Sequence, residues 1–299
     1  MMNRRELLAA TGAAGLSLAG FPLGWTAQNT SAKKKVLMFT RSQGFEHSSI
    51  KRGGDKLSHA EQILTDLGAK SGFDVTCTKD GRVFVPEEIA KYDVFFFYTT
   101  GDLTKEGGDK NPPMPPEGKA ALLKAIAGGK GFIGSHCATD TFHTAGDRAA
   151  NQERDKLDPY IAMIGGEFIR HGAQQKAWMR VVDAKFPGAK ELKDFELNEE
   201  WYALKNFAPD LHVILVQDTK DMKGFDYERP NFPATWARMN DKGRVFYTSM
   251  GHREDVWTNK IFQDLVLGAL SWTARNVEVD ITPNLVMVTP KAAELPVKK

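Results

Sequence analysis

The chain has few cysteines and almost no net charge, and each scarcity excludes a class of protein. Its 299 residues include two cysteines, Cys77 and Cys137, so the fold cannot depend on a disulfide framework, and we expect both thiols to be free. The formal net charge is +2. That balance argues against nucleic acid as a partner, because a nucleic-acid surface needs a concentrated basic excess.

Beyond its first thirty or so residues, the sequence has no apolar run of membrane-spanning length. The N-terminal part pairs Arg4–Arg5 with a mildly apolar stretch, rich in Ala, Gly and Leu, that ends near Pro22. This pattern predicts a twin-arginine export signal over residues 1–32, with cleavage near Ala32. We therefore expect an exported protein of the periplasm or cell envelope, free of the membrane after cleavage. An uncleaved anchor is the alternative.

Strand and helix patterns alternate after residue 33. Apolar runs predict buried strands, and helical spacing of apolar residues predicts helices between them. The expected strands cover 36–42, 73–78, 94–100 and 131–136, and the expected helices cover 55–70 and 117–128. This order predicts an α/β fold with a doubly wound, mostly parallel sheet flanked by helices.

The second half is richer in strands. The pattern predicts strands at 176–183, 212–219, 234–239 and 244–251, followed by a helix over 256–274. No internal repeat or linker is visible. We therefore expect a single domain over 33–280 and a C-terminal tail, 281–299, that lies against the surface.

Three histidines follow separate predicted strands. His47, His136 and His252 each come after an apolar run, and ligands of open α/β sheets bind beyond the carboxyl ends of the strands. Three imidazoles and a carboxylate form a typical ligand set for a divalent metal such as zinc or manganese. The alternative is that each histidine only hydrogen-bonds a loop backbone, since the sequence has no dense metal motif.

Cys137 raises a different possibility, that of a nucleophilic thiol beside a histidine. A nucleophile elbow requires small residues two positions to either side of the nucleophile. Gly134 and Ala138 stand at those positions around His136, not around Cys137. The spacing therefore favours a packed thiol at Cys137.

Four segments together resemble the ThuA-like (trehalose utilisation) family over about residues 34–275. They are GFIGSHCATDTF at 131–142, NEEWY at 198–202, PATW at 233–236 and RVFYTSMGH at 244–252. The resemblance implies a class I glutamine amidotransferase-like, flavodoxin-like fold without the cysteine nucleophile. Glu200 matches the glutamate of the family's D-E-L-Y element, whereas Glu199 replaces its aspartate.

The resemblance also implies a role in carbohydrate metabolism, with a small sugar or keto-sugar such as 3-keto-trehalose as the partner. The implied chemistry is metal-assisted C–O cleavage or isomerisation. We assign His47, His136 and His252 as metal ligands, and Glu200, His136 and Asp140 as catalytic residues. In this assignment Glu200 is a base or fourth ligand, and Asp140 orients a histidine.

Further residues are candidates for substrate binding, and they are Trp201, Tyr202, Trp236, Thr100 and His171. The three aromatic residues could stack on a sugar ring or belong to the core. Two other functions stay open, a non-catalytic carbohydrate-binding protein and a Cys137-dependent amidase or hydrolase. A homo-oligomer is also possible.

Overall fold

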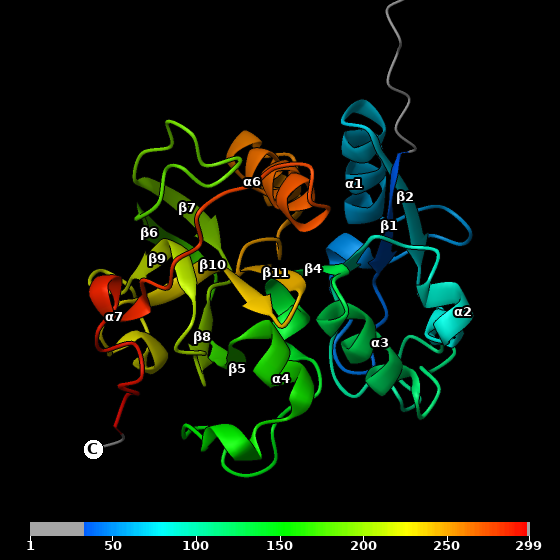
Figure 1. The fold of residues 1–299 in the computed structure, drawn as a ribbon. Helices are drawn as coiled ribbons and strands as arrows, with labels where there is room; N and C mark the ends of the chain where they lie inside the picture. The colour runs from blue at the N-terminus through cyan, green and yellow to red at the C-terminus, as the bar shows by residue number, and fades with distance from the viewer. Residues whose placement is uncertain (1–32, 298–299) are drawn as a thin grey trace, which may run out of the picture. The chain divides into compact units, whose positions relative to one another are not determined.

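A nine-stranded sheet forms the centre of the computed structural model, which describes residues 33–297 (Figure 1). The strand order is β2-β1-β3-β4-β11-β10-β9-β6-β7. Pairing is parallel from β2 to β11 and antiparallel from β11 to β7. The predicted signal segment 1–32 lies outside the described residues. The α/β prediction is confirmed, with an antiparallel half added to the parallel one.

The parallel half consists of β1 (Lys34–Phe39), β2 (Phe73–Thr78), β3 (Val94–Phe97), β4 (Gly131–Ser135) and β11 (Gly243–Thr248). The antiparallel half consists of β10 (Phe232–Asn240), β9 (His212–Asp218), β6 (Gln175–Val181) and β7 (Phe195–Glu199). A separate antiparallel pair joins β5 (Glu167–His171) to β8 (Tyr202–Lys205). The central strands β3, β4 and β11 are buried throughout, as their continuous apolar runs require.

Helices cover both faces of the parallel half (Figure 1). One layer holds α1 (His59–Lys70), α5 (Glu254–Trp257) and α6 (Lys260–Thr273), and the other holds α2 (Pro86–Ile89), α3 (Gly118–Ala127) and α4 (Pro159–Ile164). Short 3-10 turns complete the chain: η1 (Ser48–Ile50), η2 (Gly81–Val83), η3 (His136–Asp140), η4 (Arg154–Lys156) and η5 (Phe225–Tyr227). No helix in residues 33–297 is long and apolar enough to cross a membrane.

Several predicted boundaries were wrong for local reasons. The helix expected from residue 55 begins at His59, because Ser58 and Glu61 form a capping box. The helix expected over 256–274 is split into α5 and α6 by the cap of Asn259. Strand β1 ends at Phe39, and two residues later the buried Arg41 donates hydrogen bonds to the carbonyls of Leu103 and Asn111.

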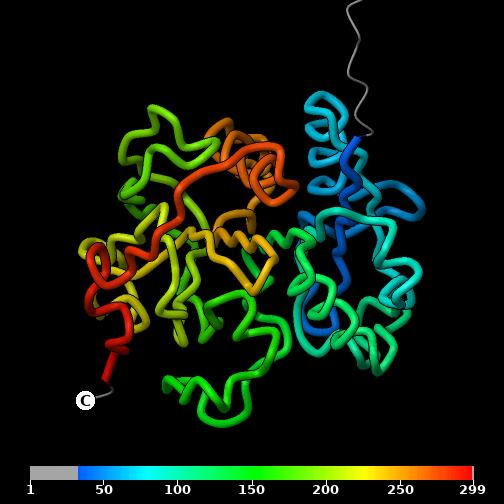
Figure 2. The backbone as a smooth tube through the Cα atoms, viewed as in Figure 1, coloured from blue at the N-terminus to red at the C-terminus, as the bar shows by residue number. Residues whose placement is uncertain are grey.

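The C-terminal segment runs from α6 across the antiparallel half to α7 (Leu285–Val288), as the orange-to-red trace in Figure 2 shows. Asn284 fixes the segment there. Its side-chain oxygen accepts a hydrogen bond from the Val213 backbone amide, and its backbone amide donates to the Leu211 carbonyl. Thr289 and Ala292 are buried. The described residues 33–297 therefore belong to one compact unit, with residues 281–297 packed as part of it.

A buried glutamate ties α1 to the loop that follows β1. The Glu61 carboxylate accepts hydrogen bonds from Thr40, where β1 ends, and from the Arg52 guanidinium at 2.8 and 2.9 Å. It also accepts the Ser58 amide. Burial alone would raise the pKa of Glu61, but these donors outweigh it and hold the pKa below the ordinary 4.5. Both ends of the 40–52 loop are thus fixed on one carboxylate.

We expect Glu61→Gln to lower the free energy of unfolding by about 2 to 4 kcal/mol at pH 7, because it leaves Arg52 without its buried partner. Since folding lowers the Glu61 pKa, this stabilisation is present above the unfolded pKa and is lost as pH falls through the folded value. Urea unfolding at pH 7 and pH 3 measures both effects. The exposed Glu87→Gln is the control. Equal stability of wild type and Glu61→Gln at pH 7 would contradict the prediction.

Candidate functional site

Four side chains from distant parts of the chain meet beyond the carboxyl ends of the parallel strands. The ring centroids of His47, His136 and His252 lie 5.0 to 5.2 Å from one another. Glu200 joins them, with its Oε2 3.6 Å from His136 Nε2 and 3.1 Å from His252 Nδ1. One ligand atom from each of the four lies within 4.8 Å of the others. We call these four residues the histidine cluster.

His136 sits on the sharp turn between β4 and η3. Its φ of 45° is a left-handed conformation that is rare for a residue with a side chain. The turn is tightly packed, since a Cβ on Gly134 would come within 2.9 Å of Ala138 and of Ile164. His136 Nδ1 lies 3.1 Å from the Ser249 carbonyl, so it carries the proton and Nε2 keeps a free electron pair facing the cluster.

The backbone at Gly251 and His252 is held by hydrogen bonds to both of its amides and to the Gly251 carbonyl. Glu199 Oε2 accepts the amides of Gly251 and His252, at 2.9 and 3.1 Å. The Gly251 carbonyl accepts the Tyr98 hydroxyl and the Trp257 indole N–H. Gly251 has a φ of 124°, and a Cβ there would lie 2.6 Å from Ser135 Oγ, so glycine is required.

His47 enters the cluster from the loop after β1. The loop is paired with the end of the β3 segment, where the Gln43 amide donates to the Thr100 carbonyl at 2.9 Å. Thr100 Oγ1 in turn donates to the Phe45 carbonyl at 3.0 Å. The adjacent Ser49 hydroxyl lies 3.3 Å from the Tyr98 hydroxyl, which also holds Gly251. Tyr98 therefore links the segments that carry His47 and His252.

The environment separates the charge states of the cluster. Burial, together with the neighbouring His136 and His252, holds the pKa of His47 well below its usual value, so His47 is neutral at pH 7. Burial disfavours the charged form of His252, but the Glu200 carboxylate outweighs this and raises the His252 pKa. Burial would raise the pKa of Glu200, and His136 and His252 instead hold it far below its usual range. Glu200 is therefore a carboxylate.

The cluster has the donor set of a divalent-metal site. His47 Nδ1, His136 Nε2 and His252 Nδ1 are buried without a hydrogen-bond partner among the described residues, although His252 Nδ1 lies near Glu200. Buried polar atoms are almost always paired, so nitrogens that converge on one point without a partner form a candidate cation site. Nitrogen and carboxylate ligands suit zinc or manganese. Binding at His252 would release the proton that it shares with Glu200.

His171 and Asp140 occupy different places relative to the cluster. Strand β5 brings His171 Nδ1 to 3.3 Å from Glu200 Oε1, and 43% of the His171 side chain is exposed. Asp140 accepts from His143 at 2.6 Å and from Arg148 at 3.1 Å. It therefore orients a histidine, as expected, but that histidine is His143, which is not one of the four residues of the histidine cluster.

Four predicted substrate-binding residues are buried. Trp201 and Trp236 are fully buried, and their indole N–H groups donate to the carbonyls of Gln175 and Ile164. Thr100 is also buried and holds the Phe45 backbone. Tyr202 is buried as well, with its ring centroid 4.0 Å from that of His136. Their burial leaves no surface for a sugar ring, which argues against the prediction that they bind substrate directly.

Both cysteines are free thiols, as predicted. Cys137 is fully buried, and burial raises the pKa of its thiol well above the usual value. A neutral thiol without access to a ligand is a poor nucleophile. The arrangement argues against a Cys137-dependent amidase or hydrolase.

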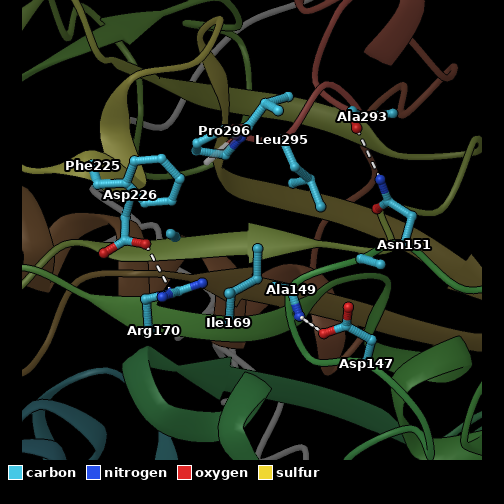
Figure 3. Close-up of a pocket in the computed structure, with 13 residues that line it drawn as sticks. Asp147, Ala149, Asn151, Ile169, Arg170, Phe225, Asp226, Ala293, Leu295 and Pro296 are labelled. Atoms are coloured by element: carbon cyan, nitrogen blue, oxygen red, sulfur yellow. Dashed lines mark hydrogen bonds and ion pairs between the residues drawn. The ribbon is translucent and has the colours of Figure 1, made fainter. Parts of the chain in front are cut away.

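A pocket of about 670 Å³ lies away from the cluster, between η5, β5, β8 and the C-terminal segment (Figure 3). Arg170 and Asp226 face each other across part of it at 2.9 Å, and no histidine lines it. Arg170 and Asp226 pair with each other, and Asp147 accepts the amide of Ala149. The histidine cluster, where four ligand atoms converge, remains the better candidate for chemistry.

Sequence reasoning missed Glu199 and Tyr98, the two residues that position the cluster. Glu199 stands where the family pattern has aspartate, and it is fully buried and accepts three backbone amides, those of Glu200, Gly251 and His252. Two consecutive glutamates in the NEEWY segment were the available signal. Tyr98 gave no signal beyond its place after the aromatic strand.

We expect Glu199→Gln to lower the free energy of unfolding by about 1 to 3 kcal/mol, because an amide NH₂ then faces a backbone N–H that has lost its acceptor. Glu196→Gln is the matched control, since Glu196 lies on the same strand with its side chain in solvent beside Lys176. Urea unfolding of both variants measures the difference. A Glu199→Gln protein as stable as Glu196→Gln would contradict the assigned role.

Comparisons with known proteins agree with this fold. A ThuA-like protein from Bacteroides uniformis superposes with a TM-score of 0.60 at 20% identity, covering 85% of this chain and 95% of its own. A ThuA-like protein from Parabacteroides merdae gives 0.53 at 16% identity, covering 89% and 98%. A search of curated proteins gave no match. The family described as trehalose utilisation matches residues 35–273, and the chain therefore belongs to the ThuA family.

Proposed function

We propose that this ThuA protein binds a divalent metal in the histidine cluster and processes a keto-sugar such as 3-keto-trehalose. Family membership supports a carbohydrate-related role. The observation that carries the finer proposal is the convergence of three imidazole nitrogens and the Glu200 carboxylate at one point, with His47 Nδ1 and His136 Nε2 left without a hydrogen-bond partner.

The ligands in this proposal are His47, His136, His252 and Glu200. A divalent ion held there supplies a positive charge that stabilises negative charge on a substrate ketone oxygen. The fixed backbones of His136 and His252 keep the ligand nitrogens in place before substrate arrives. Glu200 Oε2 faces His136 and His252 and would be the oxygen available to the ion, whereas Oε1 faces His171.

A ketone at C3 of the sugar acidifies the proton on C2. When a base removes that proton, the electron pair of the C2–H bond forms a C2–C3 double bond, with negative charge on the C3 oxygen. The 2-keto isomer forms when the proton of the C2 hydroxyl passes to the C3 oxygen and a proton returns to C3, so that C2 becomes the carbonyl. Alternatively, the C3 carbonyl re-forms, a C1–C2 double bond develops and the C1–O bond breaks, so that the departing sugar takes up the proton. Both outcomes share the first step.

His171 is the residue placed to accept that proton. Its Nδ1 lies 2.9 Å from the Gly172 carbonyl, so Nδ1 carries the hydrogen and Nε2 keeps an electron pair. Its side chain is exposed beside Glu200. In this scheme His171 Nε2 accepts the proton, and Cys137 takes no part.

We expect purified protein to contain about one divalent ion per chain, measured by inductively coupled plasma mass spectrometry. His47→Ala and His252→Ala should each lose most of it, because each removes one of four ligands. His59→Ala is the control, since His59 is exposed at the start of α1. Circular dichroism checks that each variant is folded. Folded wild type that takes up no zinc or manganese would refute the metal centre.

With 3-keto-trehalose, we expect wild-type protein to release glucose or form an isomeric keto-disaccharide, detected by NMR. His171→Ala should lower kcat at least about a hundredfold, because it removes the proton acceptor while leaving the metal ligands. Cys137→Ala should retain activity. The reverse pattern, an inactive Cys137→Ala beside an active His171→Ala, would support the cysteine-dependent alternative instead.

A further inference from the structure

One aromatic ring at the histidine cluster is open to solvent. Among residues 33–297, the exposed aromatic side chains are Phe45, at 69%, and Trp178, at 38%. Phe45 lies directly beside the cluster, with its ring centroid 5.0 Å from that of His47 and the two planes perpendicular. A single exposed apolar residue is common on protein surfaces, so what distinguishes Phe45 is its contact with a residue of the cluster.

The Phe45 backbone is held firmly in place. Its carbonyl accepts the Thr100 hydroxyl at 3.0 Å, and the Gln43 amide donates to the Thr100 carbonyl. The loop packs closely there, because a Cβ on Gly44 would lie 3.3 Å from Thr100 Oγ1. The ring is therefore presented by a fixed backbone, which reduces the entropy lost when a ligand binds.

Polar side chains lie beside His252 in the cluster. Gln174 Nε2 lies 2.9 Å from His252 Nε2, and Arg253 donates to Gln174 Oε1 at 2.7 Å. Gln174 is exposed and Arg253 is partly exposed, so both can reach a ligand. An apolar ring beside His47 and amide and guanidinium donors beside His252 thus flank the same four residues.

We propose that Phe45 is the stacking surface for a pyranose ring, and that Gln174 and Arg253 bind its hydroxyl groups. A pyranose has an apolar face of C–H bonds and a rim of hydroxyls, which matches this pairing of an aromatic ring with polar donors. The buried Trp201 and Trp236 cannot provide such a surface. This inference rests on the proposed function in taking a sugar as the ligand, but it does not require turnover.

The test measures sugar binding and metal content separately. Isothermal titration with trehalose and with 3-keto-trehalose gives Kd for wild type, Phe45→Ala, Phe45→Trp and Trp178→Ala. We expect Phe45→Ala to raise Kd about tenfold, Phe45→Trp to restore it, and Trp178→Ala to match wild type. Metal content should be equal in all four proteins. In the turnover assay, Phe45→Ala should raise KM more than it lowers kcat.

Other results would overturn the proposal. Phe45→Ala that binds both sugars as tightly as wild type removes the stacking role. The stacking role is also removed if light scattering shows that Phe45→Ala changes the oligomeric state and nothing else changes. Phe45 would then contact a second copy of the chain. Metal-loaded wild type that binds neither sugar overturns the stacking role and leaves the metal centre standing. Phe45-dependent sugar binding by metal-free wild type supports the stacking role and overturns the metal-assisted function.

Discussion

The mutual approach of three imidazole rings and one carboxylate is the constraint on which the rest of the site depends. A buried polar atom without a partner costs about 1 to 3 kcal/mol, and His47 Nδ1 and His136 Nε2 are two such atoms in this cluster. Packing alone would not maintain such an arrangement, yet Glu199, Tyr98 and Ser249 all act to preserve it. The surrounding hydrogen bonds therefore hold the cluster in the form that the proposed metal ion would require.

The turn after β4 shows how the fold presents this chemistry. His136 adopts a left-handed backbone conformation, and such strain persists where the surroundings over-determine it, often at functional sites. The conformation directs the imidazole towards the cluster, while the next residue, Cys137, is buried in the core. The fold thus displays an imidazole, and not the Cys137 thiol, at this turn.

The strands of the parallel half and the three histidines were predictable because both follow from local order. An apolar run followed by a histidine places that histidine at the carboxyl edge, whatever the rest of the sheet does. The order β10-β9-β6-β7 depends on pairing between distant strands, which a single sequence does not specify. The aromatic predictions failed for a related reason. Trp236 is covered by Gly165 and Gly166, whereas Phe45 is uncovered, and neither fact is local in sequence.

The paired glutamates explain why a departure from the family pattern leaves the site intact. Successive residues at a strand end point in opposite directions, so Glu199 turns towards the backbone of the His252 loop and Glu200 towards the imidazoles. The first carboxylate needs only to accept backbone amides, which either acidic residue can do if its length suits the gap. Glutamate in place of aspartate therefore preserves the function of the position. The second carboxylate faces three imidazoles at fixed distances, so its position tolerates far less change.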